Sequence, residues 1–235
     1  DYIEEIASTL QYLADEQTGD ISPAEKLDFF RRASHCFGHS AFMMSGSGSL
    51  LFFHVGVVKA LSEAGLLPTV MSGSSGGSIV GSIVCTHSDD ELPELLQPEY
   101  FLERVPHPEG SSGIADVSEL EEAIAQFIPD LTFQQAYERS GRAMNVSVAP
   151  AETHQTSRLL NATTSPSVLI RSAVMASAAV PGIFPAVTLQ ALDSHGQRKD
   201  YLPQRKWVDG SVSDDMPAKR LARLYGVNHY LVSQT

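Results

Sequence analysis

Apolar and polar positions divide the chain into an N-terminal helical stretch and a longer segment in which short apolar runs alternate with helices. From Tyr2 to Leu13, apolar residues recur at helical spacing with acidic and amide residues between them. Ser22-Pro23-Ala24-Glu25 is a capping box with proline at the first helical position, which predicts a second helix over 23–36. We interpret residues 1–38 as an N-terminal helical cap packed on a core domain of residues 39–235.

In the core domain, short extended runs of apolar residues are separated by segments with helical character. Strands that alternate with helices are typical of a mainly parallel sheet with helices on both faces. The sequence therefore predicts a three-layer α/β fold. The predicted strands are 41–44, 69–72, 143–148, 186–189, 205–208 and 229–233, and the predicted helices are 50–61, 78–85, 91–96, 99–104, 117–128, 131–139, 168–179 and 216–225. Residues 105–113 have the composition of a loop, either a lid or a spacer.

Ser75 is the best candidate for a nucleophile. It lies in Gly73-Ser74-Ser75-Gly76-Gly77, between the strand predicted over 69–72 and an apolar helix. The G-x-S-x-G spacing suits a nucleophile elbow, because Gly73 and Gly77 leave no side chains to clash with a tight turn. The alternative is a surface loop rich in glycine and serine. The strand before the motif and the helix after it favour the elbow.

A second glycine-rich turn, Ser45-Gly46-Ser47-Gly48-Ser49, joins another strand to a helix. Such a turn directs backbone N–H groups at one spot, which suits an oxyanion or equally a phosphate. Gly46 and Gly48 begin a near match to a dinucleotide fingerprint, but Leu51 replaces the third glycine. No acidic residue ends the next strand either. Nucleotide binding is therefore the weaker interpretation.

Asp209 is the candidate base, since it ends a predicted strand and Gly210 follows it. In a parallel sheet, chemistry gathers beyond the carboxyl ends of the strands, although an acid at a strand end is often only a turn former. Among the histidines, His154 follows the third strand and could reach this edge, and it remains an alternative third member of the site. The simpler interpretation is a Ser75–Asp209 dyad in which the carboxylate takes the hydroxyl proton.

Composition narrows the classes of partner. The 235 residues carry 43% hydrophobic and 19% charged side chains, as in an ordinary soluble globule. A net charge of -12 argues against nucleic acid and means that docking on an anionic membrane would need apolar contacts. Cys36 and Cys85 are interpreted as buried thiols. No residue cluster has metal-ligand spacing, so neither a metal nor another cofactor is expected.

Three motifs together resemble the patatin-like phospholipase family: the turn 45–49 before a helix, the elbow 73–77 and Asp209-Gly210. The similarity extends over nearly the whole chain, and it is closest to the branch with lipid-droplet triacylglycerol lipases and related bacterial proteins. The resemblance implies that Ser75 is the nucleophile and Asp209 the base. It also implies that the oxyanion donors are backbone amides. These belong to the turn and the elbow, at Gly46, Ser47, Gly48 and Gly76.

The resemblance implies a serine acyl hydrolase acting on lipid esters, either triacylglycerol or phospholipid. We expect it in the cytoplasm or at a peripheral membrane or lipid-droplet surface, and a homo-oligomer remains open. Leu50, Leu51 and Phe52 would line an acyl channel or pack in the core. Ser47 and Leu51 stand where the family usually has glycine. The alternative is therefore a catalytically weakened relative that binds lipid or acts as a scaffold. Because the chain begins with Asp1, missing targeting signals carry no conclusion.

Overall fold

The computed structural model describes residues 2–15, 19–104, 117–152, 155–212 and 214–235. The loop 105–113 and His154, both singled out from the sequence, lie outside the described residues. The chain forms two compact units, Asp1–His39 and Ser40–Thr235, and each is described by itself.

The N-terminal unit contains the two helices that the sequence predicts, α1 (Tyr2–Ala14) and α2 (Pro23–Phe37). The capping box at the start of α2 is formed in both directions. The Ser22 hydroxyl accepts from the Glu25 N–H, and the Glu25 carboxylate accepts from the Ser22 N–H at 3.0 Å. Helix α2 ends where Gly38 adopts a φ of 72°. The packing of this unit as a cap on the core stays a prediction.

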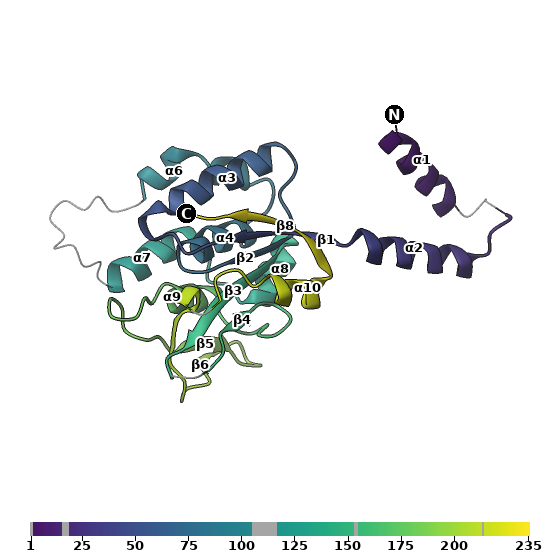
Figure 1. The fold of residues 1–235 in the computed structure, drawn as a ribbon. Helices are drawn as coiled ribbons and strands as arrows, with labels where there is room; N and C mark the ends of the chain where they lie inside the picture. Colours follow the sequence, from purple (N-terminus) through teal and green to yellow (C-terminus); the bar gives the residue numbers. More distant parts are fainter. Residues whose placement is uncertain (1, 16–18, 105–116, 153–154, 213) are drawn as a thin grey trace. The chain divides into compact units, whose positions relative to one another are not determined.

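The second unit is built on a six-stranded sheet with the order β4-β3-β2-β1-β8 (Figure 1). The sixth strand, β7, pairs with β3. β1, β2 and β3 run parallel, while β4 and β7 are antiparallel to β3. This mixed sheet with parallel central strands confirms the predicted α/β class. The strands are β1 (His39–Met44), β2 (Val70–Gly73), β3 (Ala143–Pro150), β4 (Arg158–Leu160), β7 (Trp207–Asp209) and β8 (Val227–Ser233).

Both faces of the sheet carry helices, as the side chains of β1 illustrate. Phe42 and Met44 pack in the large core under α3 (Leu51–Glu63), α4 (Gly76–Cys85) and α9 (Ile170–Ser177). Ala41 and Met43 point to the other face and pack with residues of α10 (Ala218–Tyr225). The remaining helices are α5 (Leu92–Leu95), α6 (Pro98–Leu102), α7 (Val117–Phe127) and α8 (Phe133–Ser140), with the 3-10 turns η1 (Gly48–Leu50) and η2 (Gly210–Val212).

The structure departs from the sequence prediction around a small hairpin of β5 (Leu189–Leu192) and β6 (Arg198–Tyr201). The pattern placed a strand at 186–189 and predicted no strand over 198–201. The first three residues of β6 are exposed, so this strand has no apolar alternation and depends on pairing with β5. Helix α9 begins two residues later than predicted, because Val168 and Leu169 form bridges to other segments.

The two cysteines differ in their environment, so the prediction of two buried thiols is wrong for Cys36. Cys36 is exposed and Cys85 is buried, and neither forms a disulfide. Burial raises the pKa of the Cys85 thiol to about 12, which keeps it protonated and unreactive near neutral pH. Within the described residues, the helices are too short or too polar to span a bilayer.

Candidate active site

Ser75 occupies a strained turn between β2 and α4. Its φ of 47° and ψ of -123° lie outside the regions that ordinary residues favour. The turn closes because the flanking glycines have no Cβ. A Cβ on Gly73 would lie 2.3 Å from the carbonyl of Gly77, and one on Gly77 would lie 2.5 Å from the Met44 oxygen. The spacing of the two glycines therefore has a direct steric cause, and Ser75 is left partly exposed at the tip of the turn.

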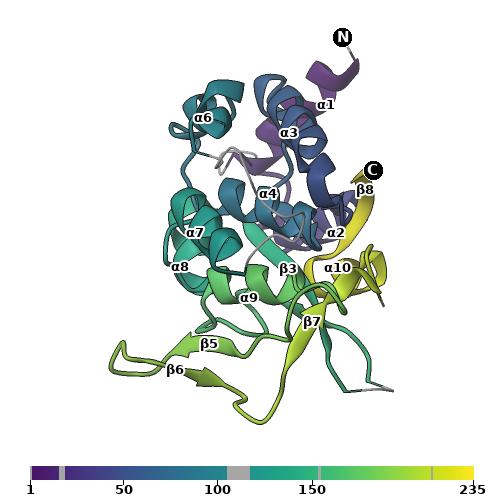
Figure 2. The ribbon, with the colours of Figure 1, turned by 90° about the vertical axis from the view of Figure 1, so that its left-hand side faces the viewer.

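A hydroxyl from α9 holds the backbone of the elbow. The N–H of Ser75 donates to the Ser177 Oγ at 3.0 Å, and Ser177 donates its own proton to the Ser147 carbonyl at 2.8 Å. Ser177 is completely buried near the end of α9, which lies against β3 and β7 (Figure 2). Sequence reasoning missed this residue, because α9 is rich in small side chains and nothing local distinguishes Ser177.

The strand that carries Asp209, β7, runs in the opposite direction to the one that the sequence predicts. β7 is antiparallel to β3, so Asp209 does not end a parallel strand. β3 extends past its last pair with β2, Gly73 with Val146, and β7 pairs with this extension so that Asp209 lies opposite Val148. Gly210 then passes so close to β3 that a Cβ on it would lie 2.4 Å from the Ser147 carbonyl.

Asp209 is nearly inaccessible, with 2% of the surface of the residue exposed. Burial raises the pKa of this carboxyl, hydrogen bonds from Ser211 and from the Ser75 hydroxyl oppose the rise, and the charge of Asp215 adds to it. The Ser211 N–H donates to Asp209 Oδ1 at 2.8 Å and fixes the side chain. The Ser75 hydroxyl is thus close enough to this buried carboxyl to lower its pKa.

The glycine-rich turn lies directly beside the elbow. A Cβ on Gly46 would lie 3.6 Å from the Ser75 Cβ. The Gly46 N–H is already engaged, since it donates to Asp215 Oδ1 at 3.0 Å. Among the described residues, the N–H groups of Ser47, Gly48 and Gly76 have no hydrogen-bond partner. Of the four residues predicted as oxyanion donors, these three have available amides and Gly46 does not.

Ser47 and Leu51, the two residues that stand where the family usually has glycine, both lie against Gly76. A Cβ on Gly76 would lie 2.1 Å from the Ser47 Oγ and 3.3 Å from the Leu51 Cβ. The Ser47 hydroxyl is buried and has no hydrogen-bond partner within the described part of the chain. The two larger side chains therefore occupy the space that Gly76 leaves open.

Comparison with known proteins assigns this arrangement to a family. Residues 42–222, which include the elbow, the glycine-rich turn and Asp209, match the family described as patatin-like phospholipase. The chain belongs to the patatin-like phospholipase family. Among solved structures, that of VipD from Legionella pneumophila is similar, with a TM-score of 0.51 at 16% identity over 84% of this chain and 50% of that chain. This likeness supports the fold.

Curated relatives match this patatin-like chain from end to end. It is 35% identical to the triacylglycerol lipase SDP1L of Arabidopsis thaliana, covering 100% of this chain and 32% of the relative. It is 38% identical to a patatin-like phospholipase domain-containing protein of Cryptococcus neoformans, covering 100% of this chain and 28% of the relative. The chain thus spans about a third of the length of the curated relatives it matches.

The apolar residues after the glycine-rich turn of this patatin-like domain have two different environments. Leu50 is 60% exposed and Phe52 is 47% exposed, while Leu51 is partly buried against the main core. The Phe52 ring also meets the ring of Phe101 edge-on, with centroids 5.9 Å apart. The alternative prediction, that these residues pack in the core, is therefore wrong for Leu50 and Phe52 and correct for Leu51. The proposed acyl channel stays a prediction.

The buried histidine closest in sequence to the glycine-rich turn has both ring nitrogens engaged. The His54 Nε2 donates to the Ser45 carbonyl at 3.1 Å, so its Nδ1 accepts from the Ser233 hydroxyl at 2.7 Å. Burial lowers the pKa of His54, which favours the neutral ring. His54 therefore ties α3 to the end of β8 and to the start of the turn, and its position does not suit a general base.

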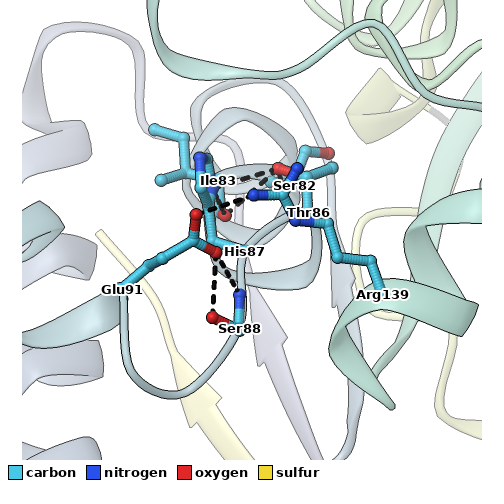
Figure 3. A network of polar contacts seen from close by, with 7 residues as sticks. All are labelled: Ser82, Ile83, Thr86, His87, Ser88, Glu91 and Arg139. Atoms are coloured by element: carbon cyan, nitrogen blue, oxygen red, sulfur yellow. Dashed lines mark hydrogen bonds and ion pairs between the residues drawn. The ribbon is translucent and has the colours of Figure 1, made fainter.

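His87 has a structural role at the other end of α4 (Figure 3). Its Nδ1 lies 2.8 Å from the Ile83 carbonyl, and next to it Glu91 accepts from the Ser88 N–H and from Arg139 at 2.7 Å. Helix α4 has ten residues, so it separates His87 from Ser75 by about 15 Å. Across the described ranges, no group of three or more His, Cys, Asp or Glu side chains could hold a metal ion.

Proposed function

We propose that this domain is a serine acyl hydrolase that cleaves fatty-acyl esters of lipids through a Ser75–Asp209 dyad. One observation carries the proposal: the serine of a strained elbow and Ser211, whose N–H holds the buried Asp209 carboxyl, lie on the same side of Gly46, and the Ser75 hydroxyl lowers the raised pKa of that carboxyl. Membership of the patatin-like phospholipase family supports an ester as the substrate. The raised pKa of Asp209 suits a general base, because proton transfer is most efficient when the pKa of the base approaches the working pH.

The first half of the reaction forms an acyl-enzyme. Ser75 Oγ attacks the ester carbonyl while Asp209 takes the hydroxyl proton. The carbonyl oxygen becomes an oxyanion, which the available N–H groups of Ser47, Gly48 and Gly76 stabilise. When the tetrahedral intermediate collapses, the bond between carbon and the alcohol oxygen breaks, and Asp209 returns the proton to the leaving alcohol. Ser75 then carries the fatty acyl group as an ester.

The second half releases the fatty acid. Water attacks the acyl-Ser75 ester, and Asp209 takes a proton from the water as it attacks. The bond to Ser75 Oγ breaks, and the proton returns from Asp209 to that oxygen. The site needs no histidine in this scheme, which agrees with the engagement of both ring nitrogens of His54.

Exposed apolar side chains beside the turn support docking on a lipid surface. Leu50 and Phe53 are 60% and 57% exposed, and both belong to the segment that leaves the glycine-rich turn. A chain of net charge -12 gains little electrostatic attraction from an anionic surface. We infer that apolar contacts bring the site to lipid, and similarity to SDP1L favours triacylglycerol over phospholipid as the substrate.

Labelling with a fluorophosphonate tests the assignment directly. We expect the folded protein to form an adduct on the peptide that contains Ser75, and Ser75→Ala to lose both the adduct and the hydrolysis of p-nitrophenyl butyrate. Ser49→Ala is the matched control, because Ser49 is exposed and belongs to the neighbouring turn. Triolein and phosphatidylcholine, presented as emulsions, separate the two substrate classes. An adduct on another residue, or folded protein that remains unlabelled, would count against the dyad.

The second candidate is a weakened relative that binds lipid without turning it over. The crowding of Ser47 and Leu51 against Gly76 favours this reading, since it changes the wall of the oxyanion site. Binding of triolein emulsion by wild type without release of fatty acid, together with an absence of fluorophosphonate labelling, would support this candidate.

A further inference from the structure

A second carboxylate, that of Asp215, lies between the two turns of the site. Its Oδ1 accepts the N–H of Gly46 at 3.0 Å and also the hydroxyl of Ser74. Gly46 belongs to the turn that follows β1, and Ser74 directly precedes the nucleophile in the turn that follows β2. One oxygen atom therefore joins the exits of two neighbouring strands.

The sheet itself holds these two exits weakly at this point. The last residue pair between β1 and β2 is Met44 with Gly73. One backbone hydrogen bond follows, from the Ser74 N–H to the Met44 carbonyl, and its length of 3.4 Å is at the limit for such a bond. Beyond that bond, the segments that follow β1 and β2 are joined through the side chain of Asp215. A carboxylate forms stronger hydrogen bonds than a neutral acceptor, and the Ser74 side chain that it contacts is fully buried.

We propose that Asp215 is a positioning residue that holds the oxyanion turn at a fixed place relative to Ser75. This inference rests on the proposed function. By taking up the Gly46 N–H, the carboxylate sets the direction of the peptide groups that follow, which are those of Ser47 and Gly48. A transition state is stabilised by donors that are already oriented, so a displaced turn lowers turnover more than substrate affinity.

Asp215 also acts on the base through its charge. Its negative charge opposes ionisation of Asp209 and is one of the causes of the raised pKa of that carboxyl. Ser75 and Ser211 are the other groups that act on this pKa besides burial. Removing the charge without removing the oxygen therefore shifts the acid limb of kcat/KM to lower pH. A residue with a purely structural role would not produce this shift.

The experiment compares Asp215→Ala and Asp215→Asn with Asp214→Asn. The control is adjacent in the chain, and the carboxylate of Asp214 lies 3.5 Å from Arg220 on the partly exposed surface. Because a buried donor left without a partner loses about 1–3 kcal/mol, we expect Asp215→Ala to lower kcat roughly 5- to 150-fold with KM within about 3-fold. Asp215→Asn keeps an acceptor oxygen, so its loss of kcat is smaller and its acid limb moves to lower pH. Asp214→Asn keeps the wild-type kcat and pH profile.

Two further measurements keep the test decisive. Hydrogen exchange should speed up in peptides covering 44–50 and 73–79 in Asp215→Ala and stay unchanged in Asp214→Asn. If Asp215→Ala does not fold, the same comparison is made with Ser74→Ala. In the double variant of Ser74→Ala and Asp215→Ala, the loss of kcat should be less than the product of the single losses, because both residues act through one contact.

The outcomes separate the two proposals. Unchanged exchange in both peptides, or a wild-type kcat in Asp215→Ala, overturns the positioning role. If wild type hydrolyses no ester and Ser75 takes no label, the proposed function fails, and with it the catalytic role of Asp215. The exchange data still decide in that case whether Asp215 joins the two turns.

Discussion

Gly77 of α4 lies directly against the end of β1, so we expect a single methyl group added at this residue to lower stability strongly. A Cβ on Gly77 would lie 2.5 Å from the Met44 oxygen and 2.6 Å from the Ser45 oxygen. Both atoms belong to the backbone, so no side-chain rotation relieves the overlap. An ordinary contact is 3.4 Å, so α4 in Gly77→Ala must retreat by about 0.9 Å from the sheet.

The expected cost follows from two opposing effects. Overpacking a buried contact costs about 1–3 kcal/mol, and two backbone clashes place this site at the upper end of that range. Alanine is a better helix former than glycine by at most about 1 kcal/mol, which offsets part of the cost. The net loss in the free energy of unfolding is therefore about 2 kcal/mol for Gly77→Ala. For a domain of this size, that loss lowers Tm by roughly 4–8 °C.

Gly76→Ala is the matched control, because it adds the same methyl group one residue earlier in the same helix. Its new Cβ would meet the Ser47 Oγ at 2.1 Å, an atom that rotation can move away. We expect its stability to stay within about 1 kcal/mol of wild type, since the helix gain offsets a small cost. Ester hydrolysis should fall because Ser47 is displaced in the oxyanion turn, and Ser47→Gly added to Gly76→Ala should restore it.

Urea unfolding followed by tryptophan fluorescence measures both stabilities. Trp207 is the single tryptophan of the chain and is fully buried in β7, so it reports on the core of the second unit. Equal unfolding midpoints for Gly77→Ala and Gly76→Ala would refute the steric reasoning. Failure of Ser47→Gly to restore hydrolysis in Gly76→Ala would refute the link between Gly76 and the oxyanion turn.

Two further predictions concern groups around the nucleophile. Asp209→Asn should lower kcat by roughly 10²–10⁴-fold. Asp209→Asn should also raise Tm at pH 7. The folded-state pKa of Asp209 is raised, so the folded protein loses stability as pH rises from the ordinary Asp range through that pKa and the carboxyl ionises. Asparagine stays neutral and avoids this loss. The gain in Tm should vanish near pH 3, and a lower Tm at pH 7 would contradict the assignment. Ser177→Ala leaves the partly buried Ser75 N–H without its acceptor, so kcat should fall roughly 5- to 150-fold, and a wild-type kcat would exclude this role.

The helices and the elbow could be predicted from sequence because their causes are local. The capping box of Ser22 and Glu25 joins residues three positions apart, and the steric need for Gly73 arises within one turn, against the backbone of Gly77. Gly77 itself is required by the end of β1, but the G-x-S-x-G spacing is a local signal. The central strands were predictable for a similar reason, since buried parallel strands are continuous apolar runs. β6 has exposed charged residues instead and was missed.

Long-range contacts had no such signal. Gly46 meets Asp215 across 169 residues, Ser74 meets Asp215 across 141, and Ser75 meets Ser177 across 102. A polar residue has the same appearance in a sequence whether it is exposed or buried against a turn. The direction of β7 was equally hidden, since the sequence pattern placed Asp209 at the end of a parallel strand.

The sequence by itself therefore determined the nucleophile candidate, the glycine-rich turn and the α/β class, because steric and capping rules act over a few residues. Only the tertiary structure decided which atoms surround that nucleophile. It brought in Asp209 on an antiparallel strand, engaged the Gly46 amide with Asp215, and exposed Leu50 while packing Leu51. Those outcomes depend on how distant strands and helices pack, and packing is a property of the whole chain.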